Sequence, residues 1–366
     1  MSLHKKIILY IDSGTFREDY ARVYDQIYEQ LINSGFAVTT VLGPRSTVNV
    51  KNRFSHYSPI TIEEIDVKAS IRFKHIFLYV FALLKKELPF ARRKPWINIG
   101  GFRMLVKFLI WLEVQKPELI LSIKYDSSYE FISAANRLRI KTVAIQHGEG
   151  SLDTLPKRVH EWPASNILVW SDFWKEKYES LYGKQARFHS MNAILWHARY
   201  CSISPQRSRK IVFYESAFFS IRLIKDAIKK FGKDRVLIKP HPYKLQHGLS
   251  LTLEHFPDQM CEKSLWEELP FIGVSFGSTV TNELIYMDTP CISLASDHDI
   301  ALSFPPTGSF PPDVDEEMIT GLLFKLDVDP FFRKQFVDKQ RLESGRFVVD
   351  SNPAHRIASF CKSCLT

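Results

Sequence analysis

Short runs of hydrophobic residues alternate with longer amphipathic stretches along most of this chain. Short apolar runs are typical of strands buried on both faces, and a period near 3.6 residues is typical of helices. Predicted strands cover residues 7–11, 37–42, 117–122, 141–146, 167–170, 210–214, 236–239, 271–275 and 291–294. Predicted helices cover residues 17–34, 73–86, 101–115, 129–138, 221–231 and 279–287, and a further one ends at residue 181. This alternation predicts parallel sheets covered by helices on both faces.

The chain is long enough for two domains. Its 366 residues exceed what one hydrophobic core usually organises. The polar segment 202–208 interrupts the alternation, and a second strand–helix series begins at Lys210. We therefore predict an α/β fold of two doubly wound, Rossmann-like domains, residues 1–201 and 209–345, which face a common cleft. We expect residues 346–366 to form a helix that packs back on the first domain.

Two segments at strand ends in the second half carry residues suited to a phosphate. Lys239-Pro240-His241-Pro242 follows the strand at 236–239, so Lys239 and His241 are expected at its carboxyl end, where open α/β sheets bind ligands. Gly277, Ser278 and Thr279 lie between the strand at 271–275 and the next helix, where hydroxyl groups and unpaired N–H groups favour an anion. The alternative is that the histidine belongs to an ordinary turn and the hydroxyl residues only cap the helix.

Three further segments carry polar residues near the expected ligand site. Ser216 follows the strand at 210–214 and is a candidate for nucleotide contact, and Glu262 lies between the two phosphate segments. Either residue has the alternative of an exposed position in a turn. Asp297-His298-Asp299 has the Asp-x-Asp spacing that can hold a metal with a diphosphate, but it falls late in the chain, so we interpret it as a loop.

The first half offers one candidate for proton transfer. Gln146-His147-Gly148-Glu149-Gly150 stands at the carboxyl end of the strand at 141–146, where a glycine-flanked turn can hold His147 and Glu149 toward a ligand. The segment is not a dinucleotide-binding fingerprint, because Asp153 stands where the third glycine would be.

The net charge of +9 bears on which classes of partner the protein binds. Basic residues concentrate between residues 68 and 107, but no zinc-finger spacing or aromatic RNA-binding signature accompanies them, so we expect no nucleic-acid partner. The same region carries Phe77, Leu78, Phe81 and Trp96. Two interpretations stay open for it: a helix with solvated lysines, or a surface that rests on anionic lipid headgroups.

Cysteine usage and hydropathy bear on the compartment. The five cysteines are scattered, and residues 1–6 lead directly into a strand rather than into a signal-peptide core, so we expect a reduced, cytoplasmic protein. Cys361 and Cys364 have the spacing of a redox or metal pair, but no second pair accompanies them. The longest apolar run, 76–84, is too short to span a bilayer, so any membrane contact is expected to be peripheral, on the inner face.

Taken together, Gln146–Gly150, Lys239–Pro242 and Ser278-Thr279, with Glu283 and Pro290 downstream, resemble motifs of bacterial surface-polysaccharide glycosyltransferases of the GT-B fold. The pattern is similar to that of capsule sialyltransferases and polysialyltransferases that use CMP-sialic acid, and of capsule Kdo transferases. Teichoic-acid CDP-glycerol transferases share part of it. The resemblance covers roughly residues 140–295.

The resemblance implies a role for each motif residue. Glu149 would act as general base, His241 would meet the departing CMP phosphate, and Ser278 and Thr279 would bind that phosphate. Several relatives carry two carboxylates where this chain has one, so His147 is the substitute candidate for the base. The resemblance implies inverting transfer of a sialic or other nonulosonic acid, or of Kdo, to a glycan or glycolipid acceptor held by the first domain. No cofactor is implied, and a donor with one phosphate has less need of a metal ion.

Other functions stay open on the same residues. A CDP-glycerol transferase, a UDP-sugar transferase or a UDP-sugar epimerase would share the fold with a different donor. A non-catalytic protein of glycan binding or assembly would bind nucleotide without turnover. A basic nucleic-acid binder would instead show affinity that falls steeply with salt.

Overall fold

The computed structural model describes residues 5–11, 18–43, 46, 48–61, 99–123, 129–146, 164–182, 187–195, 197, 204–216, 219–246, 248–265, 267–295, 306–311, 313–344 and 352–366. Its described residues fall into two compact units. Unit 1 takes those within Met1–His147, Asp153–Ala198 and Val349–Thr366, and unit 2 takes those within Arg199–Val348. Each unit has its own parallel sheet, so the predicted pair of doubly wound α/β domains is confirmed as the fold class.

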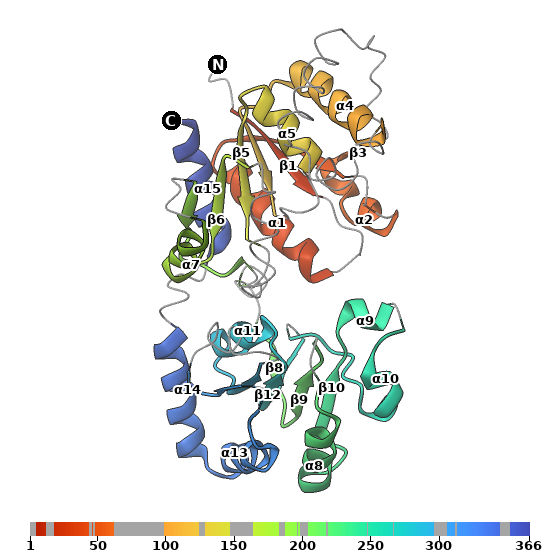
Figure 1. Cartoon of the computed structure of the whole chain (residues 1–366), viewed down its shortest axis with the longest axis vertical. Helices are drawn as coiled ribbons and strands as arrows, with labels where there is room; N and C mark the ends of the chain where they lie inside the picture. Colours follow the sequence, from red (N-terminus) through yellow and green to blue (C-terminus); the bar gives the residue numbers. More distant parts are fainter. Residues whose placement is uncertain are drawn as a thin grey trace. The chain divides into compact units, whose positions relative to one another are not determined.

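Unit 1 is built on a seven-stranded parallel sheet in the order β3-β2-β1-β4-β5-β6-β7 (Figure 1). Its first strand is central because it pairs with β2 on one side and with β4 on the other. The strands are β1 (Lys6–Ile11), β2 (Ala37–Leu42), β3 (Ile60–Thr61), β4 (Leu119–Ser122), β5 (Lys141–Ile145), β6 (Asn166–Val169) and β7 (Phe188–Ser190). The helices are α1 (Glu18–Asn33), α2 (Val48–Arg53), α4 (Ile99–Gln115), α5 (Tyr129–Arg137), α7 (Asp172–Tyr182) and α15 (Pro353–Leu365).

Aromatic stacking joins the sheet of unit 1 to one helical layer. The Tyr10 ring of β1 stacks on Phe131 of α5 with centroids 4.5 Å apart, and Phe108 of α4 meets the same Phe131 ring edge-on at 5.0 Å. All three side chains are buried. Large buried aromatic pairs of this kind stabilise by area and by ring geometry together, so α4 and α5 are fixed on the strands that they cover.

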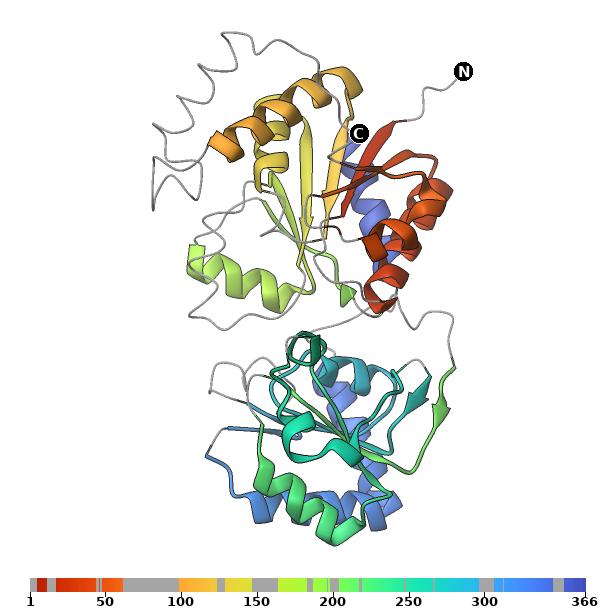
Figure 2. The same ribbon diagram turned by 90° about the vertical axis from the view of Figure 1, so that its right-hand side faces the viewer.

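The last helix of the chain belongs to unit 1. Helix α15 packs against α1, and both views show the two side by side (Figures 1 and 2). Asn352 caps its first turn by accepting a hydrogen bond from the His355 N–H at 3.0 Å. At its other end, Lys5 and Lys141 donate to the final carbonyl groups, which otherwise lack partners within the helix. The segment after unit 2 therefore returns to complete unit 1.

Unit 2 is built on a five-stranded parallel sheet in the order β10-β9-β12-β13-β14. Its strands are β9 (Ile211–Tyr214), β10 (Val236–Lys239), β12 (Ile272–Ser275), β13 (Cys291–Leu294) and β14 (Ser309–Phe310), and β8 (Gln206–Arg207) pairs separately with β11 (Glu268–Leu269). Its helices are α8 (Ile221–Phe231), α9 (Pro242–Gln246), α10 (Leu251–His255), α11 (Val280–Tyr286), α13 (Glu316–Val328) and α14 (Pro330–Ser344).

Both faces of this sheet are covered by hydrophobic side chains. One cluster joins the strands to α8, α13 and α14, and a second, smaller cluster joins them to α11. Gly273 of β12 allows α11 to lie close to the strand, because a Cβ atom there would stand 2.4 Å from the Leu284 side chain. Coverage on both sides explains why the strands of this unit are continuous apolar runs.

Differences from the sequence predictions fall at short elements and at the two long helices α13 and α14, which were not predicted. The polar segment 202–208, which separates the two predicted domains, contains β8, a two-residue strand that has no hydrophobic pattern to reveal it. The helix predicted at 73–86 lies outside the described residues. Within the described ranges, no helix is both long and apolar enough to cross a membrane.

A buried glutamine ties α14 to the sheet of unit 2. The Gln340 side-chain oxygen accepts from the Cys291 N–H at 3.1 Å, and its amide nitrogen donates to the carbonyl groups of Cys291 and Thr307 at 2.6 and 2.9 Å. These main-chain groups are at the start of β13 and just before β14, where neighbouring secondary structure leaves them unpaired. Gln340 therefore replaces water as their partner.

Replacing Gln340 by methionine keeps the volume and removes all three hydrogen bonds. We expect Gln340→Met to lower the free energy of unfolding of unit 2 by about 1–3 kcal/mol, because buried polar groups are left without partners. Urea denaturation followed by far-UV circular dichroism measures the change. Lys339→Met, at the exposed neighbouring position, is the matched control and should change stability by less than about 0.5 kcal/mol. Equal losses in the two variants would contradict this role for Gln340.

Candidate functional site

Strand pairing brings together the segments that were predicted to bind phosphate. Strand β9 lies between β10 and β12, and Tyr214 is in register with Lys239 on one side and with Ser275 on the other. All three strands are parallel, so the segments that follow them leave the same edge of the sheet. The chain passes from β9 to β10 on one side and then to β12 on the other. Such a reversal opens a crevice at the carboxyl ends of the strands, where ligands of doubly wound folds bind.

Lys239 ends β10 and ties down a neighbouring loop. Its ammonium group donates to the main-chain carbonyl groups of Glu262 and Lys263 at 2.6 and 3.0 Å. The Cys261 N–H also donates to the Ile238 carbonyl at 2.8 Å. The structure thus brings Glu262 next to Lys239 through its backbone, while the Glu262 residue itself is exposed. Lys239 fixes this side of the edge and contributes a positive charge to it.

His241 stands at the junction between β10 and α9. Its carbonyl group accepts from the Leu245 N–H at 2.9 Å, which makes it the first acceptor of the short helix. Pro242 occupies the first helical position, where its fixed φ angle favours the turn and its missing N–H is not needed. His241 is half-buried. The His-Pro pair therefore sets the backbone that carries the imidazole at the strand end.

The carboxylate that organises this edge belongs to Glu215, which directly follows β9. Its side chain is fully buried. It accepts hydrogen bonds from the Ser250 hydroxyl at 2.7 Å, the Leu251 N–H at 2.9 Å and the Thr252 hydroxyl at 3.0 Å. The Lys244 ammonium lies 3.5 Å away. Glu215 thus holds both α9 and the start of α10, the elements that follow His241, against β9.

The environment of Glu215 favours its ionised form. Burial alone would raise the pKa of this carboxyl group, but the hydrogen bonds from Ser250, Leu251 and Thr252, with the charge of Lys244, outweigh burial and hold the pKa below its ordinary value of 4.5. The sequence prediction singled out Ser216 in the same turn, and Ser216 is half-buried next to it. An acidic residue directly after a buried strand was the available signal for Glu215.

The loop after β12 turns the chain sharply into α11. Gly277 has a φ angle of 69°, a left-handed conformation that glycine adopts without strain. Ser278 receives the Val280 N–H on its hydroxyl oxygen at a long 3.4 Å. Thr279 is the residue before α11, and its side chain makes no capping hydrogen bond. The interpretation of these hydroxyl groups as helix caps is thus not met at Thr279 and is met only weakly at Ser278.

Behind this loop lie buried polar side chains. The hydroxyl oxygens of Ser275 and Thr281 are 2.6 Å apart, which links the end of β12 to the first turn of α11. Glu283 of the same helix is buried as well. Burial raises the pKa of Tyr214 well above its ordinary value, and Glu283 contributes to the shift through its charge. The contact between Ser275 and Thr281 holds the loop on the sheet.

In unit 1, the described part of the predicted proton-transfer segment is its first residue. Gln146 is buried and joins β5 to β6: its side-chain oxygen accepts from the Trp170 N–H at 3.0 Å, and its carbonyl group accepts from the Trp170 indole N–H at 3.0 Å. Gln146 therefore has a structural role. His147 and Glu149 lie outside the described residues, as does the segment Asp297-His298-Asp299.

Comparison with known proteins gives a likeness of fold. No family model and no curated protein sequence matches the chain. Among solved structures, a UDP-N-acetylglucosamine 2-epimerase matches with a TM-score of 0.62 and 13% identity over 99% of this chain and 96% of that one. The Neisseria meningitidis UDP-GlcNAc 2-epimerase bound to UDP-GlcNAc gives 0.60 and 10% over 98% and 99%. MurG of Acinetobacter baumannii gives 0.52 and 10% over 98% and 99%.

The protein has the GT-B fold. These matches span nearly the full length of both chains, so the likeness includes both units. At 10–13% identity it supports the fold and leaves the reaction to the residues of the site. In the GT-B fold of this chain, the carboxyl edge of β9, β10 and β12 in unit 2 is the candidate site.

The ionised state of Glu215 makes the stability of unit 2 depend on pH. Because the pKa of Glu215 is lower in the folded protein than in the unfolded chain, its stabilisation is complete above pH 4.5 and is lost as pH falls through the folded value. We expect Glu215→Gln to lower the free energy of unfolding at pH 7 by about 1–3 kcal/mol, and this difference to shrink below pH 4.5.

Urea denaturation of both proteins between pH 3 and 7 measures this effect. Glu254→Gln, at an exposed carboxylate of α10, is the matched control and should change stability little at any pH. A difference between wild type and Glu215→Gln that stays constant across this range would show that the charge of Glu215 does not stabilise the fold.

Proposed function

We propose that this protein is an enzyme that acts on a nucleotide-activated sugar, with the nucleotide phosphate bound to unit 2. The observation that carries the proposal is the strand register that aligns Tyr214 with both Lys239 and Ser275. This register places His241 and the Gly277–Thr279 loop at one edge of the sheet, beside its switch point. A positive or hydrogen-bonding imidazole, hydroxyl groups and free main-chain N–H groups are the chemistry that binds a phosphate.

The proposed reaction is transfer of the sugar to a hydroxyl group of a glycan or glycolipid. As the bond from the anomeric carbon to the phosphate breaks, negative charge grows on the leaving phosphate. His241, Ser278 and Thr279 would stabilise that charge, and fixed donors of this kind usually make the largest contribution available to an enzyme. The Thr279 side chain does not cap α11, and this favours its proposed role at the phosphate.

The proton of the acceptor hydroxyl requires a base. Glu149 remains the proposed general base, with His147 as its substitute, on the strength of the motif resemblance. A base contributes about 10²–10⁴-fold to rate. Attack from the side opposite the leaving phosphate would invert the configuration at the anomeric carbon.

Two donors are candidates. The motif resemblance favours a CMP-activated acidic sugar, either a nonulosonic acid or Kdo, and this is our first choice. A UDP-sugar, used in transfer or epimerisation, is the second, because similar structures have been solved with UDP-GlcNAc and with UDP. Since CMP leaves with one phosphate and UDP with two, the donors also differ in their need for a divalent cation.

Thermal stabilisation by CMP, CDP, UDP and GDP tests the site and ranks the donors. We expect one nucleotide to stabilise the wild type by about 2.7 kcal/mol at a concentration of about 100 Kd, and His241→Ala to lose most of this shift. His255→Ala, in the same unit, is the matched control and should keep it. A CMP-specific shift supports the first donor and a UDP-specific shift the second, whereas no shift with any nucleotide would contradict the proposal.

Turnover separates a transferase from a binding protein. We expect Glu149→Gln to retain nucleotide binding but to lose about 10²–10⁴-fold in donor-dependent release of nucleotide. His147→Ala, measured in parallel, identifies the base, because the larger loss belongs to the residue that takes the proton. With a CMP-sugar, activity should persist in excess EDTA. Saturable nucleotide binding without turnover of any donor would instead identify a non-catalytic protein.

A further inference from the structure

A hollow of unit 2 lies at the edge of its sheet opposite the candidate donor site. Its volume is about 570 Å³, and it is formed by the segments that lead into β9, β12 and β13 together with one side of α14. These are the amino ends of the strands, whereas the candidate donor site lies at their carboxyl ends. The four residues of β9 span roughly 13 Å, so the two sites are separate.

The lining of this hollow carries an excess of positive charge. Five basic and two acidic side chains line it. Both acids are paired: Asp338 with Lys334 at 2.5 Å, and Asp288 with Arg341 at 2.8 Å. Three arginines, Arg207, Arg209 and Arg333, therefore have no carboxylate among the residues that line the hollow.

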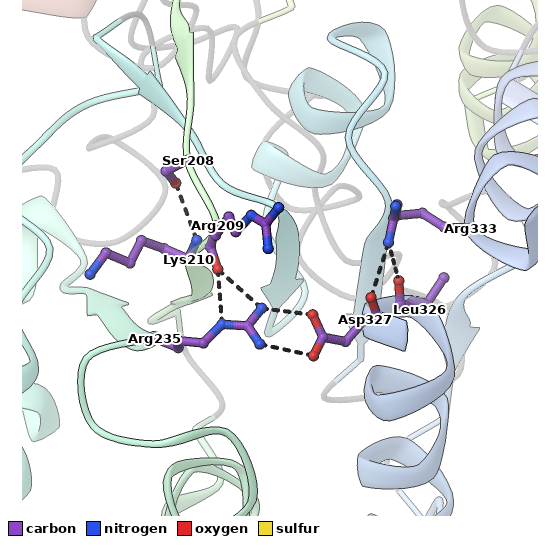
Figure 3. Close-up of polar contacts among 7 residues, drawn as sticks. All are labelled: Ser208, Arg209, Lys210, Arg235, Leu326, Asp327 and Arg333. Carbon is purple, nitrogen blue, oxygen red and sulfur yellow. Dashed lines mark hydrogen bonds and ion pairs between the residues drawn. The ribbon is translucent and has the colours of Figure 1, made fainter. Parts of the chain in front are cut away.

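A nearby carboxylate outside the lining is already occupied. Asp327 receives two parallel hydrogen bonds from the Arg235 guanidinium, at 2.7 and 2.9 Å (Figure 3). The pKa of Asp327 is lowered, first by these hydrogen bonds and to a lesser extent by the charges of Arg333 and Arg209. Since the bidentate pair satisfies both carboxylate oxygens, Asp327 leaves the charges of the two lining arginines incompletely balanced.

Two of the three arginines are held in place without being neutralised. Arg207 donates to the carbonyl groups of Met287 and Asp288, at the end of α11, at 2.9 and 3.3 Å. Arg333 donates through Nη1 to the carbonyl groups of Leu326 and Asp327, at 2.8 and 3.2 Å. Carbonyl partners leave the full positive charge on each guanidinium. Such fixed forks are preorganised for an anion and lose little entropy on binding it.

The third arginine is exposed. Arg209 makes no side-chain hydrogen bond or ion pair within the described parts of the chain, and Figure 3 shows it extending from the segment before β9 toward the side on which Arg333 lies. Apolar residues stand beside them: Phe271 lies under the Arg333 guanidinium at 4.2 Å, and three prolines and Val337 also line the hollow. The hollow thus offers guanidinium forks next to a surface suited to a ring or another apolar body.

We propose that this hollow is a second ligand site, which binds a phosphate or diphosphate group attached to such a body. Guanidinium groups match phosphate oxygens in pairs, which a lysine cannot do. The phosphate could belong to a soluble metabolite or to a lipid headgroup, and the chemistry of recognition is the same. The site is independent of the proposed function, because it shares no residue with the edge that carries His241.

Calorimetric titration of the full chain with pyrophosphate tests this site. The titration is done in His241→Ala, so that the candidate donor site contributes little. We expect saturable binding that weakens about tenfold or more in Arg209→Gln and in Arg207→Gln. Lys229→Gln, which removes the same charge from an exposed position of α8, is the matched control and should change affinity less than about twofold. Melting curves confirm that each variant is folded.

A second arm uses vesicles that contain phosphatidic acid. Binding to these vesicles alone, with the same dependence on Arg207 and Arg209, would also support the site and would assign the phosphate to a lipid. The proposal is overturned if neither probe binds saturably, or if the arginine variants behave like Lys229→Gln. If nucleotide still stabilises Arg209→Gln, the proposed donor site is independent of the arginine site.

Discussion

The buried carboxylate of Glu215 is the interaction on which the carboxyl edge of unit 2 depends. A charged group without access to water must be surrounded by donors or it is costly to bury. Glu215 finds them in Ser250, Leu251 and Thr252, which lie 35 to 37 residues further along the chain. Through these hydrogen bonds, a single side chain holds the segment after His241 at the edge of the sheet. The geometry of any ligand bound there rests on this anchor.

The central strands of unit 2 could be predicted because burial on both faces leaves an unbroken apolar run. β10 and β13 have the bounds expected from sequence, and so does α8, whose apolar side faces the core. The two-residue strands β8 and β14 could not be predicted, since pairing alone defines them. Helix α14 exposes large side chains such as Phe331 and Leu342, which obscure its amphipathic pattern.

The candidate site could be predicted in outline for the same reason. Ends of buried strands are visible in sequence, so His241 and the loop from Gly277 to Thr279 could be predicted to follow strand ends, and the structure places these strands close together. Binding of a ligand there stays a prediction. Partners across the chain are not visible in sequence. The donors to Glu215 and the use of the Lys239 ammonium to hold the carbonyl groups of Glu262 and Lys263 depend on which loops meet, and this depends on strand order.

The two edges of this sheet differ in how far their charged groups are balanced by partners. At the carboxyl edge, a buried negative charge is satisfied by its partners and the surrounding segments are held in place. At the amino edge, arginines are held by carbonyl groups, so their positions are fixed while their charge is only partly balanced. The first arrangement stabilises the fold, and the second leaves positive charge that can attract an anion.

The position of α15 has a consequence for how the protein folds during its synthesis on the ribosome. The described residues of unit 2 come from one continuous stretch of chain, but the core of unit 1 includes the side chains of α15 that follow it. During synthesis the second unit can therefore finish folding while the first still waits for its last helix to emerge. Until then α1 exposes the surface that α15 will cover, and a truncation near the carboxyl terminus would leave that surface permanently open to aggregation.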